Sequence, residues 1–268
     1  MTSYIDSVPQ KLREFYPQKL HIWNMRPGGI AWDTATLLLS GGKTAVVPTK
    51  VGYIIMTADC SGLERKFEMK ERPKSKPGVV LCSSVEQIKE LAHINDNIER
   101  LYQYCWAKDI LLGCILPWRT RSAVIHIPDD GSNEMIMDER GTSCFVIKYG
   151  DPSERVAESL WENHGKLAFA SSANPSGKGN RGKLQYVGDK ILQSADSLVF
   201  ADDYVERQQP DKTMETRWEQ GVMVSMVDDS GLLVDNPVVI RRGLSLDKIL
   251  FELSTVYDSF DYRHGAYH

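Results

Sequence analysis

The chain has 268 residues, of which 42% are hydrophobic and 25% are charged, so it can bury a sizeable core and is not a disordered chain, a collagen or a coiled coil. Its 32 Lys and Arg residues against 36 Asp and Glu residues give a formal net charge of −4, which argues against nonspecific nucleic-acid binding over the whole surface. No apolar run reaches the roughly 18 residues of a membrane span, and the polar start lacks the pattern of a signal peptide. We therefore expect a cytoplasmic protein without membrane contact.

Helical and strand-like patterns alternate along the chain after a polar leader, which we place at residues 1–25. The short connections between them are typical of one compact α/β or α+β domain, placed at residues 26–250 and followed by a tail at 251–268. A helix is expected at residues 31–40 and a strand at 44–47, which stops at Pro48. Ser83 and Ser84 precede Glu86 and Gln87 by three residues, a capping-box pattern that predicts a helix over the following apolar positions.

The second half of the chain continues this alternation. Residues 119–141 are polar and irregular, which indicates an insertion. A helix from Ser153 to near Gly165 leads directly into a strand at 167–171. Further strands are expected at 197–201, 221–227 and 237–240, and a closing helix at 246–253.

The sequence gives no sign of a metal centre or disulfide framework. Its five cysteines are scattered, and none has the two-residue spacing typical of zinc sites and redox dithiols, so we expect reduced and mostly buried thiols. His264 and His268 have the spacing of one helical face, but the glycine between them favours a frayed segment over a metal site.

A basic segment at residues 65–77 stands out in this acidic chain, with six basic side chains and two acidic ones. If Lys70 and Arg72 lie in extended chain, as Pro73 favours for the residue before it, both point to the same side. An ammonium beside a flat guanidinium suits a phosphate or a carboxylate. Taken alone, however, the segment fits a solvated basic loop better.

A polar segment follows the strand at 167–171. Pro175 favours extended geometry at Asn174, so Ser172 and Asn174 would share a face and offer a hydroxyl and an amide to a ligand. A serine-rich turn is the alternative. The next loop, 178–183, combines three cations with glycines that would let backbone amides approach an anion, although surface flexibility explains it almost as well.

Two more segments lie at strand ends. Thr49, Lys50 and Tyr53 follow the strand at 44–47, where α/β proteins commonly place binding residues, although Tyr53 could equally belong to the core. The strand at 237–240 delivers Arg241 and Arg242 to opposite faces, so one of them is expected only on the surface. The sequence lacks a P-loop, a Rossmann fingerprint, a zinc-protease helix and a hydrolase serine elbow, which argues against the common nucleotide-binding and hydrolase routes.

In chain order, four of these segments resemble the YrdC-like (YrdC/YciO) family of threonylcarbamoyl-AMP synthases. The resemblance covers residues 28–250 and follows the patterns Gly-Gly-x-x-x-x-x-Pro-Thr, Lys-x-Arg-Pro, Ser-Ala-Asn-x-Ser-Gly and Arg-x-Gly. It implies a twisted mixed α/β sheet with flanking helices around a positively charged cleft. It also implies an enzyme that joins ATP, bicarbonate and L-threonine into threonylcarbamoyl-adenylate and releases pyrophosphate, and a separate transferase that uses this product to modify tRNA.

The resemblance also implies which residues hold the nucleotide. It places six residues there, namely the catalytic cations Lys70 and Arg72 and the nucleotide-binding residues Lys76, Ser172, Asn174 and Arg241. Because charge moves onto departing pyrophosphate as a carboxylate attacks the α-phosphate, fixed cations and Mg²⁺ bound with ATP would stabilise the transition state. No protein nucleophile is needed, so the rate would come from alignment and electrostatics.

Departures from the family pattern gather on the side that holds the amino acid in the family. Lys50, Val51 and Ile54 replace an acid, a threonine and a glycine, Leu81 a histidine, Lys148 an arginine, and Val224-Ser225 a Ser-Thr pair; a Pro-Gly-Pro turn is missing at residues 106–109. The substrate contacts that the resemblance implies are Thr49, Lys50, Tyr53, Lys148 and Ser225. A pocket built on hydrogen bonds discriminates steeply, so we infer a retained adenylation half and an altered acceptor pocket.

Three functions are open from the sequence. The leading hypothesis is a nucleotidyltransferase that resembles L-threonylcarbamoyladenylate synthase, with threonine or another small amino acid or amine as acceptor. The alternative is a noncatalytic YrdC-like module that keeps the cleft for a nucleotide or RNA. The third is a structural protein with basic surface loops.

Overall fold

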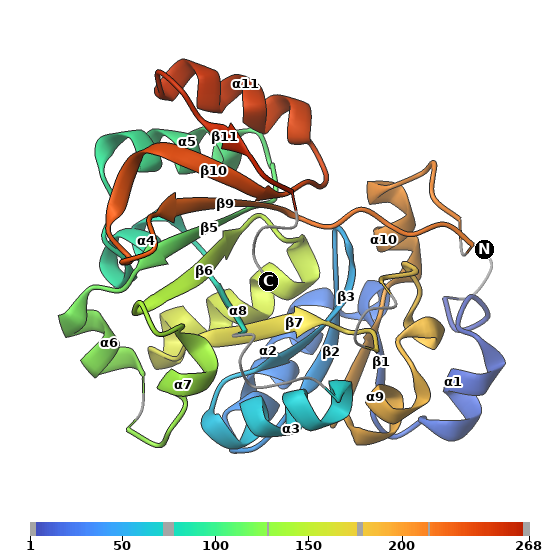
Figure 1. The fold of residues 1–268 in the computed structure, drawn as a ribbon. Helices are drawn as coiled ribbons and strands as arrows, with labels where there is room; N and C mark the ends of the chain where they lie inside the picture. The colour runs from blue at the N-terminus through green and yellow to red at the C-terminus, as the bar shows by residue number, and fades with distance from the viewer. Residues whose placement is uncertain (1–3, 72–77, 128, 176–178, 214, 265–268) are drawn as a thin grey trace. The chain divides into compact units, whose positions relative to one another are not determined.

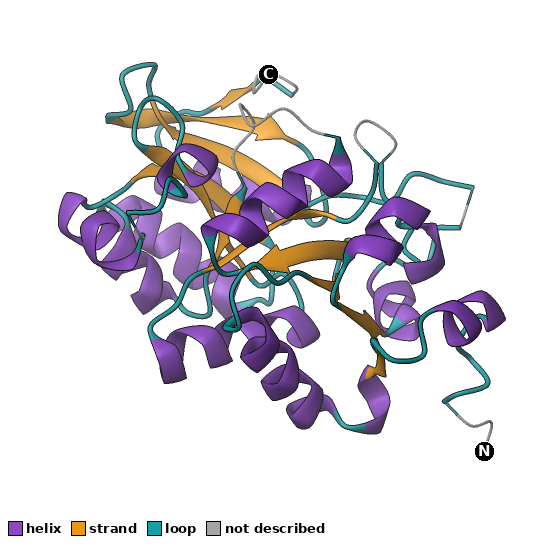
Figure 2. Cartoon of the chain, turned by 90° about the horizontal axis from the view of Figure 1, so that it is seen from below, coloured by secondary structure: helices purple, strands orange, loops and turns teal. Residues whose placement is uncertain are grey.

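The computed structural model describes residues 4–71, 78–127, 129–175, 179–213 and 215–264. The chain forms two compact units, the first made of Met1–Lys74 with Gly150–Trp218 and the second of Ser75–Tyr149 with Glu219–His268. Each unit has strands of mixed direction with flanking helices (Figure 1 and Figure 2), which confirms the predicted mixed α/β fold class. None of the helices in the described ranges combines the length and the hydropathy that crossing a membrane requires.

The strands of the first unit lie in the order β1–β8–β2–β3–β7. Their bounds are β1 (Leu20–Ile22), β2 (Ala45–Thr49), β3 (Gly52–Thr57), β7 (Ala168–Ser172) and β8 (Ser197–Phe200). β8 is parallel to both β1 and β2, whereas β3 is antiparallel to β2 and β7. β1 comes from the predicted leader and places Leu20 opposite Leu198 of β8, so that segment contributes to the sheet.

The helices of the first unit pack on these strands. They are α1 (Gln10–Phe15), α2 (Pro27–Leu38), α3 (Cys60–Lys70), α8 (Asp151–His164), α9 (Asp189–Ser194), α10 (Asp202–Gln208) and the 3₁₀ helices η1 (Trp23–Met25) and η2 (Leu184–Tyr186). α2 packs on α8, which contacts β2, while α3 contacts β3 and α9 (Figure 1). The predicted end of α8 is confirmed, since Gly165 caps it with φ 62°.

Strand β2 differs from the prediction at its end. It continues through Pro48 to Thr49 instead of stopping at the proline. A proline is tolerated here because β8 pairs with β2 at Ala45 and Val46, so Pro48 lies beyond that ladder. All five residues of β2 are buried, and the core around it includes Tyr53, Leu198 and Trp218.

The strands of the second unit lie in the order β4–β6–β5–β9–β10–β11. Their bounds are β4 (Val79–Leu81), β5 (Leu112–Pro117), β6 (Thr142–Ile147), β9 (Val222–Val227), β10 (Leu233–Arg241) and β11 (Asp261–Tyr262). The pairs β4–β6, β5–β9 and β10–β11 are parallel, and the pairs β5–β6 and β9–β10 are antiparallel. The strands predicted at 221–227 and 237–240 are confirmed as β9 and part of β10.

The helices of the second unit are α4 (Val85–Leu91), α5 (Asp96–Ala107), α6 (Thr120–His126), α7 (Asn133–Ile136) and α11 (Leu246–Val256). The capping prediction for α4 is confirmed: Ser84 Oγ accepts from the N–H of Gln87 at 3.0 Å, and Gln87 Oε1 accepts from the N–H of Ser83 at 2.7 Å. Residues 119–141, predicted to be irregular, contain α6 and α7. The sequence missed α6 because distant contacts support it, including the Arg119 N–H bonded to the Leu91 carbonyl at 2.8 Å.

Four of the five cysteines are buried, as predicted, and Cys60 is partly exposed. Burial raises the pKa of the Cys105 and Cys144 thiols to about 12, so both are protonated and unreactive at neutral pH.

Candidate functional site

Helix α3 carries Lys70 and is fixed at its start by Asp59. Oδ1 of Asp59 accepts a hydrogen bond from the N–H of Gly62 at 2.7 Å, which caps the first turn. Its Oδ2 accepts from the N–H of Gly42 at 2.8 Å and so ties the helix to the stretch before β2. Gly62 lies directly against β3, because a Cβ there would come within 1.7 Å of Thr57 Oγ1. These contacts set the position of α3 on the strands.

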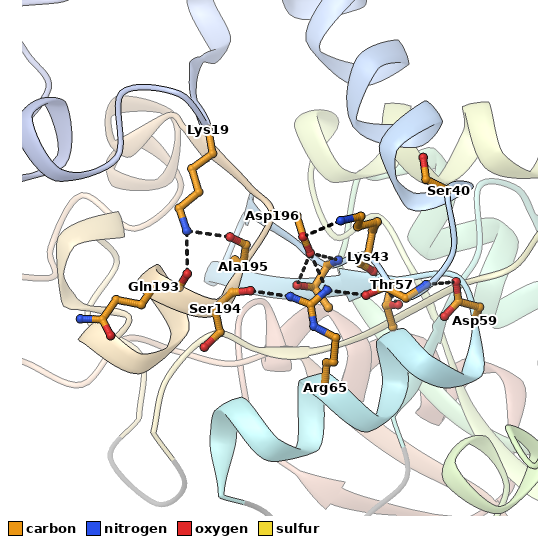
Figure 3. A network of polar contacts seen from close by, with 12 residues as sticks. Lys19, Ser40, Lys43, Thr57, Asp59, Arg65, Gln193, Ser194, Ala195 and Asp196 are labelled. Carbon is orange, nitrogen blue, oxygen red and sulfur yellow. Dashed lines mark hydrogen bonds and ion pairs between the residues drawn. The ribbon is translucent and has the colours of Figure 1, made fainter.

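A polar network around Asp196 holds the middle of α3 (Figure 3). Its carboxylate accepts from Arg65 Nη1 at 2.7 Å, from the N–H of Thr44 at 3.0 Å and from Lys43 Nζ at 3.1 Å. Arg65 also donates to the backbone carbonyl of Ser194 at 2.7 Å. Burial alone would raise the pKa of Asp196, but the hydrogen bonds from Thr44, Arg65 and Lys43 outweigh it and hold the pKa below its ordinary value of 3.8. Arg65 therefore serves to hold α3 in place.

Lys70 is the last residue of α3, so the expectation that it begins an extended stretch is wrong. The capped helix continues to Lys70 because Leu63, Phe67 and other buried residues on one face pack inward, and Glu71 ends it with φ 50°. The Lys70 side chain is only 4% exposed. Its Nζ donates to the backbone carbonyl of Ser172 and, at 3.1 Å, to Ser172 Oγ. The structure thus brings together two of the predicted site residues.

Asn174 lies two residues beyond Ser172, where the chain leaves β7. The stretch is fixed by the N–H of Ala173, which donates to the Tyr53 carbonyl at 2.8 Å. The Asn174 side chain is 7% exposed and donates through Nδ2 to the Pro175 carbonyl at 2.9 Å. Its Oδ1 is buried and accepts no hydrogen bond from the described residues. A buried acceptor of this kind fits an N–H or O–H group of a ligand.

The β2–β3 turn, residues 49–52, carries two predicted substrate contacts. Thr49 Oγ1 donates to the Gly52 carbonyl at 2.7 Å and accepts from the Val51 N–H at 3.2 Å, which holds the turn together. Lys50 is buried, and its carbonyl accepts from Gln209 Nε2 at 3.1 Å. The predicted substrate contacts of Thr49 and Lys50 stay predictions.

Tyr53, a third predicted substrate contact, is fully buried in the core. Its hydroxyl donates to Asp202 Oδ1 at 2.6 Å and accepts from the Ala201 N–H at 3.0 Å. The same Asp202 oxygen accepts from the N–H of Leu184 at 2.9 Å. Burial raises the pKa of Asp202 from 3.8 to about 6, although the Tyr53 and Leu184 hydrogen bonds act in the opposite direction. The Tyr53 hydroxyl thus joins β3 to α10.

Two of the three cationic side chains in the loop at 178–183 bond to other parts of the protein. Arg181 Nη1 donates to the Glu215 carbonyl at 2.7 Å, and Lys183 pairs with Glu206 at 2.6 Å. Lys178 lies outside the described residues. Arg181 and Lys183 are therefore engaged in holding the loop, which the sequence pattern could not distinguish from anion binding.

In the second unit, the Lys148 side chain contacts residues of the segment 106–109, so two of the departures from the expected pattern lie together. Its Nζ lies 4.7 Å from the centre of the Trp106 ring and 3.2 Å from Asp109 Oδ1. Trp106 and Asp109 belong to the segment that lacks the family's Pro-Gly-Pro turn. A cation over an aromatic face and beside a carboxylate is stabilised by both, so the altered turn accommodates the lysine.

The other residues of the second unit that the sequence singled out are Ser225 and Arg241, on the neighbouring strands β9 and β10, and Leu81 on β4. Ser225 is buried in β9 and donates through Oγ to the Val227 carbonyl at 3.1 Å. Arg241 ends β10, is partly buried and donates through Nε to the Gly221 carbonyl at 2.7 Å. Leu81 is buried at the end of β4. The predicted substrate and nucleotide contacts of Ser225 and Arg241 stay predictions.

Two predicted nucleotide-site residues, Arg72 and Lys76, lie outside the described residues. Conversely, the structure shows features that the sequence analysis missed. Lys66 is only 1% exposed and lies four residues before Lys70 on the same helix. Had residues 60–70 been assigned to a helix from the sequence, this spacing would have placed Lys66 on the same face as Lys70. The sequence does not indicate that Asp202 is the buried carboxylate, since Asp203 beside it is also an aspartate.

The chain is similar to known proteins. A family model named Sua5_yciO_yrdC and described as "Telomere recombination" matches residues 37–224. A solved structure of a hypothetical protein from Streptococcus mutans UA159 has 47% sequence identity and a TM-score of 0.85, and the match covers 93% of this chain and 99% of that one. Among curated proteins, none matches this chain.

Two further solved structures share the fold at low identity. Sua5 from P. abyssi, complexed with L-threonine, has 19% identity and a TM-score of 0.64, and the match covers 91% of this chain and 62% of that one. YciO from E. coli has 15% identity and a TM-score of 0.60, with 81% of this chain and 90% of that one covered.

Proposed function

Because the chain belongs to the Sua5/YciO/YrdC family, we propose that it is a nucleotidyltransferase that forms a carbamoyl-adenylate from ATP, bicarbonate and a small amino acid or amine. The L-threonine in the P. abyssi Sua5 structure supports an amino acid as the acceptor. The altered residues on the acceptor side, including Lys148, leave the choice between threonine and a related amine to experiment. In this proposal the product passes to a tRNA-modifying transferase.

The observation that carries this proposal is the contact of the buried Lys70 with Ser172, which is exposed at the end of β7, with Asn174 two residues further on. An ammonium shielded from water acts on a phosphate much more strongly than a solvated one. The ammonium is held by the end of a capped helix, so little reorganisation is needed when charge develops. Ser172 and Asn174 add a hydroxyl and a buried amide oxygen beside it.

In the proposed reaction, the amine and bicarbonate first condense to a carbamate with loss of water. A carbamate oxygen then attacks the α-phosphorus of ATP, and a new P–O bond forms while the bond to the oxygen that bridges the α- and β-phosphates breaks. Pyrophosphate leaves with the negative charge, which Lys70 stabilises. Asn174 Oδ1, an acceptor, suits the N–H of the carbamate.

We propose that Mg²⁺ accompanies ATP as its counterion. Within the described ranges, no group of three or more His, Cys, Asp or Glu side chains is arranged to hold a metal ion. In this proposal the metal is bound through the triphosphate, where it would neutralise phosphate charge. Arg72 and Lys76 are proposed to contact the same phosphates.

Pyrophosphate release tests the proposal. Purified protein is mixed with ATP, Mg²⁺ and bicarbonate, and each of a panel of amino acids and small amines is added; release should rise with the correct acceptor. Lys70→Met should lower the rate at least about 100-fold, because a preorganised charge is worth that much in comparable sites. Lys11→Met, which removes an exposed lysine of α1, is the matched control and should leave the rate unchanged. Arg72→Ala should abolish release.

Two results would contradict the proposal. The first is a wild-type protein that neither binds ATP nor releases pyrophosphate with any acceptor. The second is RNA binding that weakens steeply with salt, is not displaced by ATP and occurs without turnover, as expected of the noncatalytic module. Two cations of the basic segment are used by the fold, because Arg65 is paired with Asp196 and Lys66 is buried, which makes both less available to RNA.

A further inference from the structure

Asn180 connects the β2–β3 turn, which belongs to the proposed site, with the loop at 179–183. Its Nδ2 donates to the carbonyl of Val51, in the β2–β3 turn, at 2.6 Å. Its Oδ1 accepts from the N–H of Gly182, two residues further along its own loop, at 2.8 Å. Both polar atoms of the amide are therefore used, one on each segment. We propose that Asn180 is a positioning residue, which fixes the β2–β3 turn to the loop at 179–183 and, through Trp218, to the core of the first unit; this role rests on the proposed function.

The contact between Asn180 and the turn is close enough to depend on a glycine. Gly52 has φ 106°, a backbone conformation that residues other than glycine rarely adopt. A Cβ at Gly52 would lie 1.9 Å from Asn180 Nδ2 and 2.2 Å from its Oδ1. The amide of Asn180 therefore lies directly on the backbone of the turn, with no side chain between them.

The other attachments of the same loop give Asn180 a fixed base. The Asn180 carbonyl accepts from the N–H of Trp218 at 3.2 Å. Gly182, at φ 74°, lies under the Trp218 ring, since a Cβ there would come within 2.3 Å of the ring carbons. The Trp218 indole N–H donates to the Thr213 carbonyl at 3.0 Å, and its ring is buried in the core. Asn180 is thus held by the core of the first unit.

The chain that follows β7 is bonded to the β2–β3 turn at Val51 and to β3 at Tyr53, just beyond the turn. Ala173, immediately before Asn174, donates to the carbonyl of Tyr53, and Asn180 donates to the carbonyl of Val51. One attachment is a backbone bond just beyond the last pair of β3 and β7, Ile54 and Ser172, and most residues could make it. The other depends on the amide side chain of Asn180. Losing it would leave the turn held by its own Thr49 bonds and by Gln209 at the Lys50 carbonyl, and would free the Val51 carbonyl to shift.

The expected effect on the proposed reaction is one of alignment. Thr49 and Lys50 belong to the proposed acceptor side, so by holding their turn Asn180 would set where the acceptor lies against the nucleotide. Misplacing reacting groups by about 1 Å lowers the rate of the chemical step by up to about 100-fold while ATP binding is largely retained. A loss of Asn180 should therefore appear in kcat and in the KM of the acceptor, and much less in the KM of ATP.

The test compares Asn180→Ala and Asn180→Asp with the wild type and with Asn163→Ala. The aspartate keeps the acceptor for the Gly182 N–H but has no donor for the Val51 carbonyl. Asn163 lies on the exposed side of α8, where its amide donates to the Ser159 carbonyl at 3.2 Å, and serves as the matched control. The rate of pyrophosphate release is measured as a function of ATP and of acceptor concentration, and the melting temperature of each protein is recorded.

We expect the ratio kcat/KM for the acceptor to fall about 10-fold or more in both Asn180 variants, while the KM of ATP changes less than about threefold. The control variant should behave as the wild type. If Asn180→Ala does not fold, Asn180→Asp decides the question. Folded Asn180 variants with wild-type kinetics, or with equal losses for ATP and acceptor, would overturn the positioning role and leave the proposed function intact. A wild-type protein without pyrophosphate release would overturn both.

Discussion

The buried carboxyl of Asp202 makes a prediction about stability that is independent of catalysis. The perturbation is Asp202→Asn, which removes the titrating group and keeps an oxygen that can accept from the Tyr53 hydroxyl and the Leu184 N–H. Asp202 is 7% exposed, and burial raises its pKa from 3.8 to about 6. In the unfolded chain the group has its ordinary pKa. The folded protein therefore holds a proton on Asp202 at pH values where the unfolded chain has lost it.

The size of the effect follows from the two pKa values. Because the folded pKa is raised, the stabilisation by Asp202 is fully present below pH 3.8 and is lost as the pH rises through 6. A shift of about two pKa units corresponds to about 3 kcal/mol, of which about 2 kcal/mol is lost between pH 4.5 and pH 7.5. The asparagine variant does not titrate. The unfolding free energy of the wild type minus that of the variant should therefore fall by this amount as the pH rises.

Urea unfolding of both proteins at several pH values from 4.5 to 7.5 measures this difference. Other titrating groups contribute equally to the two proteins and cancel, so the slope of the difference reports on Asp202 alone. A difference that stays constant with pH, or that grows as the pH rises, would refute the reasoning about burial. A change in the m-value between the two proteins would instead indicate altered compactness of one of the two states.

Three smaller predictions concern the elements that hold the site. Asp59→Ala should lower the unfolding free energy by about 1 to 2 kcal/mol, because the cap of α3 is lost, and chemical denaturation measures it. Asp196→Asn should cost about 2 kcal/mol at pH 7 through its bonds to Arg65 and the other donors, and, since the pKa of Asp196 is lowered, this difference from the wild type should shrink as the pH falls through the acid range. Gly182→Ala should destabilise by about 2 kcal/mol or more, since its Cβ would overlap the Trp218 ring, and calorimetry should show a lower melting temperature.

The elements with strong local signals were predictable. The capping pattern at Ser84, the glycine at 165 and the apolar runs of β7, β8 and β9 are confirmed within a few residues. The failures have a common cause, which is support from distant parts of the chain. Pro48 continues β2 because of where the ladder to β8 ends, and α6 forms on contacts with Leu91 that no local pattern reveals.

Of the candidate site, the sequence predicted that Lys70 and Ser172 belong together but not how they meet. Lys70 and Ser172 meet in the structure, as the order of motifs suggested, yet Lys70 reaches Ser172 from the end of a helix and not from an extended stretch. The sequence also could not separate cations that serve the fold from cations available to a ligand. Arg65 and Arg181 are used by the protein itself, and only three-dimensional contacts show this.

The arrangement of Lys148 over Trp106 and beside Asp109 bears on how such a chain can change. An arginine at 148 would place a longer, planar group with more hydrogen-bond donors at this position. If only the lysine were replaced, the Trp106 ring and the Asp109 carboxylate would no longer match the geometry of the cation. The three positions should be epistatic, and substitutions that are harmful one at a time should become tolerable together. A change of Lys148 to arginine would therefore need accompanying changes at Trp106 and Asp109.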